Sequence, residues 1–285
     1  MTETVRSLLV IGGPATGKTH YGGQLLGRLR QRDCQLRMRE APSNISPFEE
    51  VLDRLGQGLT ANHTAMGVYH KVTLPIQAPG KGNVDLIWPD YSGEQISQII
   101  EHRRLSRTWR ERLVESDGWL FFIRLDRSRF YDDILSRPIT EMTYCELQEK
   151  PKESLWSDQA TFVELLQFFL YANGIRTLEK VTKPSLTVVL SCWDELSDVQ
   201  EGMSPADLLQ SRLPLFSDYI HSTWDNGYIG VFGLSSLGKA LSKKESDEDY
   251  LDRGPEDQGY IILPDGSKSS DLTLPVSKTM ELMIS

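Results

Sequence analysis

Residues 12–19, GGPATGKT, bring glycines, a lysine and a hydroxyl together near the start of the chain. Gly12, Gly17, Lys18 and Thr19 match the spacing G-x-x-x-x-G-K-[ST]. Glycines let the backbone curl so that successive N–H groups point at phosphate oxygens. We predict that Lys18 contacts the β- and γ-phosphates of a nucleoside triphosphate and that Thr19 binds Mg²⁺. The predicted phosphate-binding residues are Gly12, Gly13, Pro14, Ala15, Thr16, Gly17, Lys18, Thr19 and His20.

Two elements must hold this loop in place. Residues 7–11, SLLVI, are aliphatic and β-branched, which predicts a buried parallel strand. Residues 19–32 carry Leu25, Leu26 and Leu29 at helical spacing, with basic residues on the other face. A helix that begins there directs the positive end of its dipole at the bound phosphates. Strand, loop and helix therefore occur in the order that a nucleotide site requires.

A second motif follows the apolar residues 84–88, VDLIW, where Asp90 and Gly93 form the pattern D-x-x-G. An Asp at the carboxyl end of a strand beside the phosphate loop holds Mg²⁺, usually through a water molecule. The N–H of Gly93 can donate to the γ-phosphate, so that cleavage of this phosphate releases the loop. We expect Asp90 in the metal site and Gly93 in the nucleotide site.

Asp194 is predicted to read the base, because it follows the strand-like residues 186–190, LTVVL. A carboxylate there accepts hydrogen bonds from guanine N1–H and N2–H₂, which adenine does not offer. The usual motif is [NT]-K-x-D, and this chain has Ser191 and Cys192 in its first two positions. Cys192 lacks the lysine stem that packs over the purine, and Trp193 is a candidate to cover part of that surface. The alternative is an ordinary strand that ends in a surface Asp.

A fourth nucleotide-contacting segment is expected after the strand-like residues 228–232. Ser235, Ser236 and Leu237 follow this strand, and a backbone N–H of this segment is expected to meet guanine O6.

The motifs GGPATGKT, DYSGE, SCWD and SSL, each after a predicted strand, resemble those of the TRAFAC class of P-loop GTPases over roughly residues 5–240. The loop GGPATGKT and the tail from residue 253 most resemble the bacterial double-GTPase group, whose members occur as neighbouring pairs in predicted defence or conflict systems. The resemblance implies GTP or GDP and Mg²⁺ as ligands, and a companion GTPase or an effector as protein partner. A doubled arrangement would require a second polypeptide, because the sequence shows no internal repeat.

A sensor of the γ-phosphate is expected between the first helix and the D-x-x-G motif. Thr64 is the first choice, because it lies just ahead of the strand-like residues 68–76, and Thr60 is the second. Such a threonine gives its hydroxyl to Mg²⁺ and its N–H to the γ-phosphate. An ordinary surface threonine is the alternative.

Glu94 stands where Ras-like enzymes have the Gln that orients the attacking water, and Gln95 comes next. The charge of Glu94 repels the γ-phosphate unless it is screened, so we expect slow turnover or dependence on a partner. An arginine supplied by a partner is worth about 10³–10⁵ in rate. Internal candidates lie on a predicted helix for which a solvated face is the alternative role: Arg103, Arg104, Arg107 and Arg110.

Composition excludes several classes of protein. The 285 residues are 39% hydrophobic and 25% charged, as in ordinary globular proteins, and the net charge of −9 gives no sign of nucleic-acid binding. Three widely spaced cysteines and five scattered histidines argue against a disulfide framework or a zinc site. The sequence has no signal peptide and no apolar run of 18 residues, so we expect a cytoplasmic protein with no membrane partner.

The expected fold is a three-layer α/β P-loop NTPase fold with a mostly parallel central sheet and a C-terminal β-hairpin extension. Residues 1–242 are expected to form the GTPase domain, with a helical insertion at about 127–183 whose helix is capped by Ser157 or Asp158. Residues 243–285 are expected to pack on the same domain.

The leading function is a Mg²⁺-dependent switch that binds and hydrolyses GTP and controls contact with a protein partner. Two alternatives stay open. A P-loop ATPase or small-molecule kinase shares the phosphate loop but does not need Asp194. A non-hydrolysing nucleotide-binding assembly module is favoured by Glu94 and Cys192.

Overall fold

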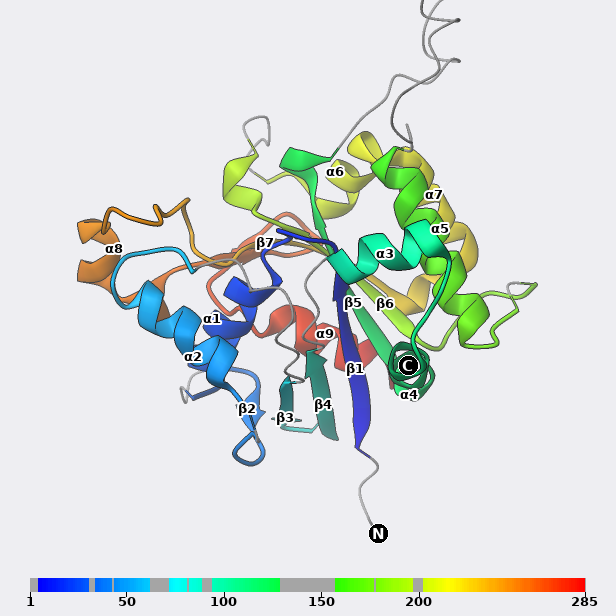
Figure 1. The fold of residues 1–285 in the computed structure, drawn as a ribbon, viewed down its shortest axis with the longest axis horizontal. Helices are drawn as coiled ribbons and strands as arrows, with labels where there is room; N and C mark the ends of the chain where they lie inside the picture. The colour runs from blue at the N-terminus through cyan, green and yellow to red at the C-terminus, as the bar shows by residue number, and fades with distance from the viewer. Residues whose placement is uncertain are drawn as a thin grey trace, which may run out of the picture.

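The structure is a computed structural model that describes residues 5–30, 34–42, 44–61, 72–80, 82–88, 94–128, 157–176, 178–196 and 202–284. Within these ranges the strands form one sheet in the order β2-β3-β4-β1-β5-β6-β7-β8-β9, with helices on both faces (Figure 1). The predicted α/β fold is confirmed. The strands are β1 (Arg6–Gly12), β2 (Arg37–Met38), β3 (Val72–Ala78), β4 (Gly82–Trp88), β5 (Gly118–Arg124), β6 (Ser185–Ser191), β7 (Ile229–Ser235), β8 (Tyr260–Ile262) and β9 (Lys268–Ser269).

The five central strands, β4, β1, β5, β6 and β7, run parallel. Antiparallel strands flank them, β3 and β2 beside β4, and β8 and β9 beside β7. β8 and β9 are the predicted C-terminal hairpin, which continues the sheet. Strands covered on both faces are apolar throughout, and all seven residues of β6 are buried.

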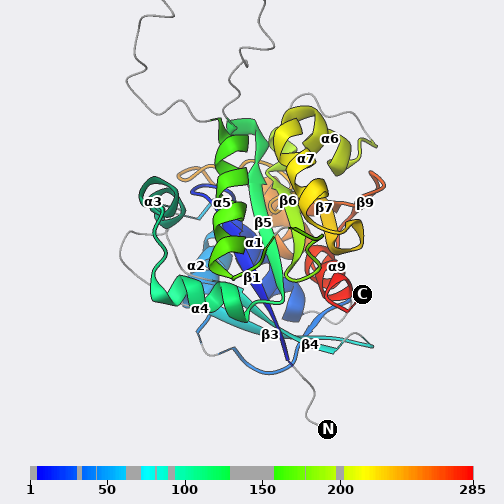
Figure 2. The ribbon, with the colours of Figure 1, turned by 90° about the vertical axis from the view of Figure 1, so that its right-hand side faces the viewer.

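Helices from distant parts of the chain cover the two faces (Figures 1 and 2). One core cluster packs α1 (Lys18–Arg30), α2 (Ser46–Leu55) and α9 (Leu274–Leu282) on the sheet. The other packs α3 (Glu94–His102), α4 (Arg107–Glu115), α5 (Asp158–Ala172), α6 (Pro205–Arg212) and α7 (Pro214–Thr223). The short α8 (Glu248–Arg253) places Tyr250 against the end of α2.

Alternate residues of β1 face opposite cores, as the period of two requires. Leu8 and Val10 belong to the core under α1, and Leu9 and Ile11 belong to the core under α5. Both faces of β1 are fully buried, so the glycine-rich loop that follows this strand begins from a rigid point.

The helix caps explain two boundaries. Ser157 caps α5, because its Oγ accepts a hydrogen bond from the N–H of Ala160 at 3.3 Å, which confirms one of the two predicted caps. Ser106 caps α4 in the same way through Trp109 N–H at 3.2 Å. Two helices, α3 and α4, lie in the region where the sequence predicted a helix, and the chain turns between them at Arg103, whose φ is 47°.

The strand register brings the candidate site residues to one edge of the sheet. Gly12 of β1 pairs with Phe122 of β5, and Arg124 of β5 pairs with Ser191 of β6. Ser191 pairs in turn with Leu234 of β7. The loops after β1, β5, β6 and β7 therefore meet at the carboxyl ends of the parallel strands, where open α/β sheets bind ligands.

No helix among the described residues has the length and apolar character needed to cross a membrane.

Candidate functional site

The lysine of the phosphate loop is folded back onto the loop that it closes. Lys18 is the first residue of α1, and its Nζ donates to Gly12 O at 2.8 Å, Gly13 O at 2.6 Å and Thr16 Oγ1 at 3.1 Å. The side chain is buried, and burial lowers the pKa of its ammonium to about 7. Three oxygens thus surround a cation whose charge is disfavoured by its surroundings, and bound phosphate would relieve that cost.

The structure explains why glycine occupies two positions of the phosphate loop. A Cβ on Gly12 would lie 2.9 Å from Phe122 Cβ and 3.0 Å from Thr16 Oγ1, so the neighbouring strand β5 leaves no room for a side chain. Gly17 has a φ of 73°, which permits the turn into α1 at no cost. Ala15 adopts a φ of 54°, a conformation that an L-residue rarely takes. Pro14 and Ala15 are exposed at the tip of the loop.

The first turn of α1 is tied to the segment that follows α2. His20 Nε2 lies 2.8 Å from Thr60 Oγ1 and accepts a hydrogen bond from Ala61 N–H at 3.2 Å. Thr60 N–H donates to Ser242 O at 3.0 Å. Thr19 precedes His20 in this turn and is half-buried. Thr60, the second choice for the γ-phosphate sensor, is therefore held beside the phosphate loop by His20, and the first choice, Thr64, lies outside the described residues.

The start of the base-reading turn packs under the phosphate loop. Ser191 ends β6, and its Oγ donates to Ile123 O of β5 at 3.1 Å. Cys192 adopts a left-handed φ of 55°, and its Sγ would lie 3.7 Å from a Cβ built on Gly17. Burial raises the pKa of the Cys192 thiol to about 12, so it is neutral at physiological pH. Cys192 thus fills space beneath the loop as a neutral side chain.

Trp193 and Asp194 belong to the short helix η3 (Trp193–Glu195) that follows Cys192. Trp193 is 6% exposed and belongs to the core under α5 to α7. A Cβ on Gly233 of β7 would collide with its indole ring, so the two residues are packed face to face. The expectation that Trp193 covers part of the purine surface is therefore not met in this structure, since the ring is occupied by β7. Asp194 is half-buried at the adjacent position.

The loop after β7 forms a tight turn. Ser235 is fully buried, and its Oγ accepts from Gly238 N–H at 2.9 Å, which fixes Ser236 and Leu237 between them. Tyr260 of β8 pairs with Ser235 and hydrogen-bonds with its side chain. Burial, followed by the charge of Asp194, raises the pKa of the Tyr260 phenol. The structure therefore places Tyr260 beside Ser235, at a position where the charge of Asp194 reaches its phenol.

Arg124 contacts both the phosphate loop and the turn that carries Asp194. Its Nη1 donates to Ala15 O at 3.2 Å, its Nε donates to Asp126 Oδ1 at 2.8 Å, and its Nη2 forms an ion pair with Glu195. Burial works against the charge, but the hydrogen bond to Asp126 and the charges of Asp126 and Glu195 outweigh it and raise the pKa of the guanidinium. The residue stays a cation.

Sequence reasoning missed both Arg124 and Tyr260. A charged residue that ends the apolar stretch GWLFFIR was the available signal for Arg124. Tyr260 gave none, because its place beside Ser235 depends on how β8 pairs with β7.

The predicted metal and hydrolysis residues are placed only in part. Asp90 and Gly93 lie outside the described residues, and Glu94 begins α3. Gln95 Oε1 accepts a hydrogen bond from Trp109 Nε1 at 3.1 Å, which directs its amide toward α4. Arg103 pairs with Glu164 at 2.7 Å and Arg107 with Glu111 at 2.8 Å. In this structure Arg103 and Arg107 thus form ion pairs with glutamates of α5 and α4.

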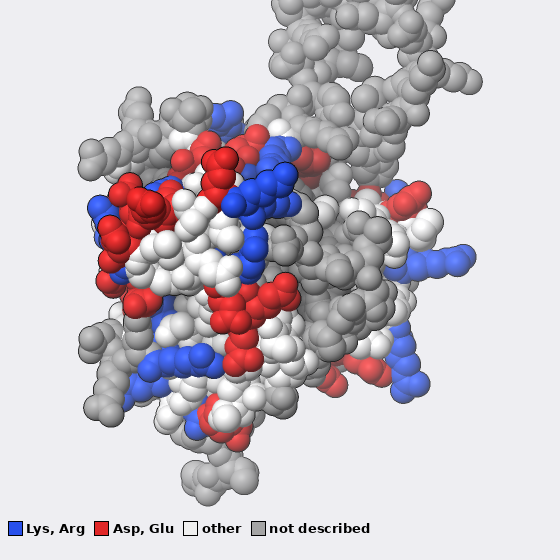
Figure 3. Space-filling view, turned by 60° about the vertical axis from the view of Figure 1, so that its left-hand side comes forward, with Lys and Arg blue, Asp and Glu red and all other residues white. Residues whose placement is uncertain are grey.

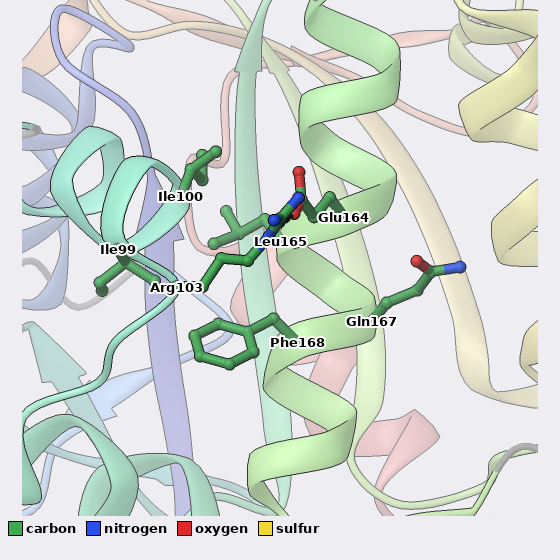
Figure 4. Close-up of a pocket in the computed structure, with 7 residues that line it drawn as sticks. All are labelled: Ile99, Ile100, Arg103, Glu164, Leu165, Gln167 and Phe168. Carbon is green, nitrogen blue, oxygen red and sulfur yellow. Dashed lines mark hydrogen bonds and ion pairs between the residues drawn. The ribbon is translucent and has the colours of Figure 1, made fainter.

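A cavity of about 240 Å³ lies between α3 and α5 (Figure 4). Ile99, Ile100, Leu165 and Phe168 form its apolar wall, and the ion pair of Arg103 with Glu164 crosses its edge. α3 is the helix that follows the D-x-x-G motif directly, so this cavity adjoins the element most directly connected to that motif.

The comparison with protein families settles the class of the chain. A family described as Double-GTPase 1 matches residues 9–279. The chain belongs to the Double-GTPase 1 family. The predicted resemblance to double-GTPases is thereby confirmed, and GTP is the nucleotide that the family description names. No curated protein matches the sequence.

Solved structures with a similar fold are distant. The signal recognition particle receptor SRb-GTP/SRX complex from Chaetomium thermophilum is 16% identical, with a TM-score of 0.41, and the match covers 84% of this chain and 94% of that chain. Methanosarcina barkeri Roco2 RocCORdC bound to GDP is 14% identical, with a TM-score of 0.36, and the match covers 98% and 49%. The S. cerevisiae Ski7 GTPase-like domain bound to GTP is 14% identical, with a TM-score of 0.42, and the match covers 82% and 43%. At this distance these proteins say nothing about the partner or the rate of this Double-GTPase 1 member.

Proposed function

We propose that this protein is a Mg²⁺-dependent molecular switch that binds and hydrolyses GTP, and that its nucleotide state controls contact with another protein. Family membership supports the GTPase class. The observation that carries the proposal is the convergence of a phosphate loop closed by Lys18 with a turn that presents Asp194, at one edge of the sheet.

The residues present fit a magnesium ion. Mg²⁺ prefers oxygen ligands and is bound in phosphate-transfer sites by one or two side chains together with the phosphates of the nucleotide. Thr19 offers a hydroxyl in the first turn of α1, and Asp90 and Thr64 are the proposed further oxygen donors. Groups of three or more carboxylate, histidine or cysteine ligands do not occur among the described residues, and a phosphate-assisted site does not need one. When bound, the ion would neutralise charge on the β- and γ-phosphates.

Different residues of the chain would bind the phosphates and orient the attacking water. Lys18 would exchange its three loop oxygens for phosphate oxygens, and the N–H groups of Gly13 and of residues 15–19 would hold the same phosphates. Glu94 and Gln95 are the proposed residues that orient water. The amide of Gln95 is bonded to Trp109, and Glu94 is anionic, so hydrolysis would be slow until a partner or γ-phosphate rearranges α3.

We propose that α3 transmits the nucleotide-dependent change in structure to the protein partner. This helix follows the D-x-x-G motif, and its inner face lines the cavity shared with α5 (Figure 4). Contact of the Gly93 N–H with a γ-phosphate would shift α3 and change the shape of that cavity. A companion GTPase is the partner that we propose, with the family description as its support. A place in a bacterial defence or conflict system, and a cytoplasmic location, stay predictions.

The surface also fits a protein partner better than a nucleic acid. On the face shown in Figure 3, the basic and acidic side chains of the described residues are interspersed and form no extended basic patch. The net charge of −9 points the same way.

Phosphate release from GTP, measured with and without Mg²⁺ and against ATP at equal concentration, tests the proposal. We expect release that needs Mg²⁺ and GTP, and a fluorescent GTP analogue that excess ATP does not displace. Effective displacement by ATP would favour the ATPase or kinase alternative. Tight GTP binding with no release, with or without a co-purifying protein, would favour the assembly module.

GTP binding is also expected to take up a proton above neutral pH. The pKa of Lys18 is about 7 in the free protein, and phosphate oxygens would return it toward or above its ordinary value of 10.5. Below pH 7 the lysine is protonated in both states, so no proton moves. Between pH 7 and 10.5 the complex binds about one proton more, and the affinity falls as the pH rises.

Titration calorimetry at pH 8.5 in two buffers of different ionisation enthalpy measures this uptake. The Cys192 thiol does not titrate at this pH, because its pKa is about 12. Equal apparent enthalpies in both buffers would contradict the prediction.

A further inference from the structure

The base-reading motif of this chain lacks its usual cation. Cys192 stands where the motif [NT]-K-x-D has lysine, and its buried thiol is neutral. The thiol also packs close to Gly17 of the phosphate loop, so residue 192 contributes a neutral contact at this place. A positive charge at this edge has to come from another element.

Arg124 supplies a positive charge from the neighbouring strand. It is the last residue of β5 and lies in register with Ser191, the last residue of β6. Its side chain is 12% exposed, which is unusual for an arginine and requires that its donors be satisfied. Nη1 bonds to Ala15 of the phosphate loop, and Nη2 pairs with Glu195, the residue that follows Asp194.

These contacts add a charged link between the phosphate loop and the Asp194 turn, which also meet where Cys192 packs beneath Gly17. Ala15 lies at the tip of the phosphate loop, in a strained left-handed conformation, and Glu195 ends the short helix that carries Asp194. The third bond, from Nε to Asp126 at 2.8 Å, fixes the plane of the guanidinium. A planar fork held at three points gives directional contacts that a flexible ammonium does not.

We infer that Arg124 is a positioning residue for guanine recognition, which takes the place of the missing motif lysine by holding the phosphate loop and the Asp194 turn at a fixed separation. The inference rests on the proposed function, since it presumes that Asp194 reads guanine.

The decisive comparison is between GTP and ITP, measured as binding affinities. The base of ITP lacks the 2-amino group of guanine, so the ratio of the two affinities reports the contact of Asp194 with the base and cancels changes in phosphate binding. Arg124→Met keeps an unbranched stem similar to that of arginine and removes its donors. We expect it to lower GTP affinity about 10-fold or more, as loss of a charged hydrogen bond predicts, and to bring the GTP/ITP ratio toward that of Asp194→Ala.

The matched control is Arg127→Met. Arg127 is three residues away in the turn after β5, is 62% exposed, and pairs with Asp126 at 3.8 Å. The Arg127→Met variant should have the wild-type affinities for GTP and ITP and therefore the wild-type ratio. Arg124→Lys, which restores the charge without the fork, should recover part of the ratio.

The double variant Arg124→Met with Asp194→Ala separates positioning from general support of the fold. If Arg124 acts through Asp194, the double variant has the same GTP/ITP ratio as Asp194→Ala alone. Should Arg124→Met fail to fold, Glu195→Gln removes the other end of the ion pair and should lower the ratio in the same direction.

An unchanged ratio in folded Arg124→Met, with a wild-type protein that prefers GTP over ITP, would overturn the inference and leave the proposed function standing. A wild-type protein that shows no preference, or no GTP binding, would overturn the proposed function and this inference with it.

Discussion

Lys18→Ala is expected to lose GTP binding by about 100-fold or more while the protein stays folded. The Nζ of Lys18 is held at 2.6–3.1 Å from three loop oxygens, so it is already at the place where phosphate oxygens would arrive. Hydrogen bonds to charged groups are worth about 1.5–3 kcal/mol each. Contacts with two phosphates would thus account for about 3–6 kcal/mol, or roughly 10²–10⁴ in affinity.

The fold should survive because burial disfavours the charge of Lys18 in the free protein. Alanine is the best helix former in the first turn of α1, and Gly13, one of the three acceptors of Lys18, is half-buried, so water can replace the donor lost at its carbonyl. Titration with a fluorescent GTP analogue measures the affinity, and thermal unfolding checks the fold. Lys278→Ala, in the exposed pair of α9 with Glu281, is the control and should bind as the wild type does. Affinity within threefold of wild type in a folded Lys18→Ala protein would contradict the assignment of the loop.

The parts of the fold that the sequence predicted are those determined by local pattern. The apolar stretches before the phosphate loop and before Asp194 became β1 and β6, because strands buried on both faces can contain little but apolar residues. The phosphate loop is equally local. Its glycines are required by the close approach of Phe122 at Gly12 and by the positive φ at Gly17.

The parts that the sequence did not predict depend on contacts between residues far apart in the chain. Trp193 was assigned to the purine because it stands in the base-reading motif, but Gly233 of the next strand offers the flat surface on which its ring packs. Arg124 is 109 residues from Ala15 and 71 from Glu195, so only the sheet register reveals that they meet. His20 and Thr60 are 40 residues apart, and a single sequence gives no pattern for such a pair.

The break between α3 and α4 has another cause. The spacing of Ile96, Ile99 and Ile100 predicted a helix after the D-x-x-G motif, and in the structure this helix ends at His102. Ser106 competes as a cap, and capping by serine stabilises a new helix start by about 1 kcal/mol. The consequence is functional, since the turn at Arg103 places this side chain opposite Glu164 at the rim of the α3–α5 cavity (Figure 4).

Asp194→Asn is expected to exchange the base preference from guanine to xanthine. The carboxylate of Asp194 offers two acceptors to the N1–H and N2–H₂ donors of guanine. Asparagine replaces one acceptor with an N–H₂ group, which faces the guanine amino group donor to donor. Loss of one charged hydrogen bond and creation of an unpaired donor should lower GTP affinity by about 100-fold or more.

Xanthine has a carbonyl oxygen where guanine has its 2-amino group, and so offers N1–H and O2 to the asparagine amide. The same substitution should therefore raise XTP affinity above that of the wild-type protein, a gain that damage to the fold cannot produce. Competition of GTP, XTP and ATP against a fluorescent analogue measures all three affinities. Asp249→Asn, on the exposed first turn of α8, is the control and should keep the wild-type order. A variant that loses GTP affinity without gaining XTP affinity would show that Asp194 does not face the base.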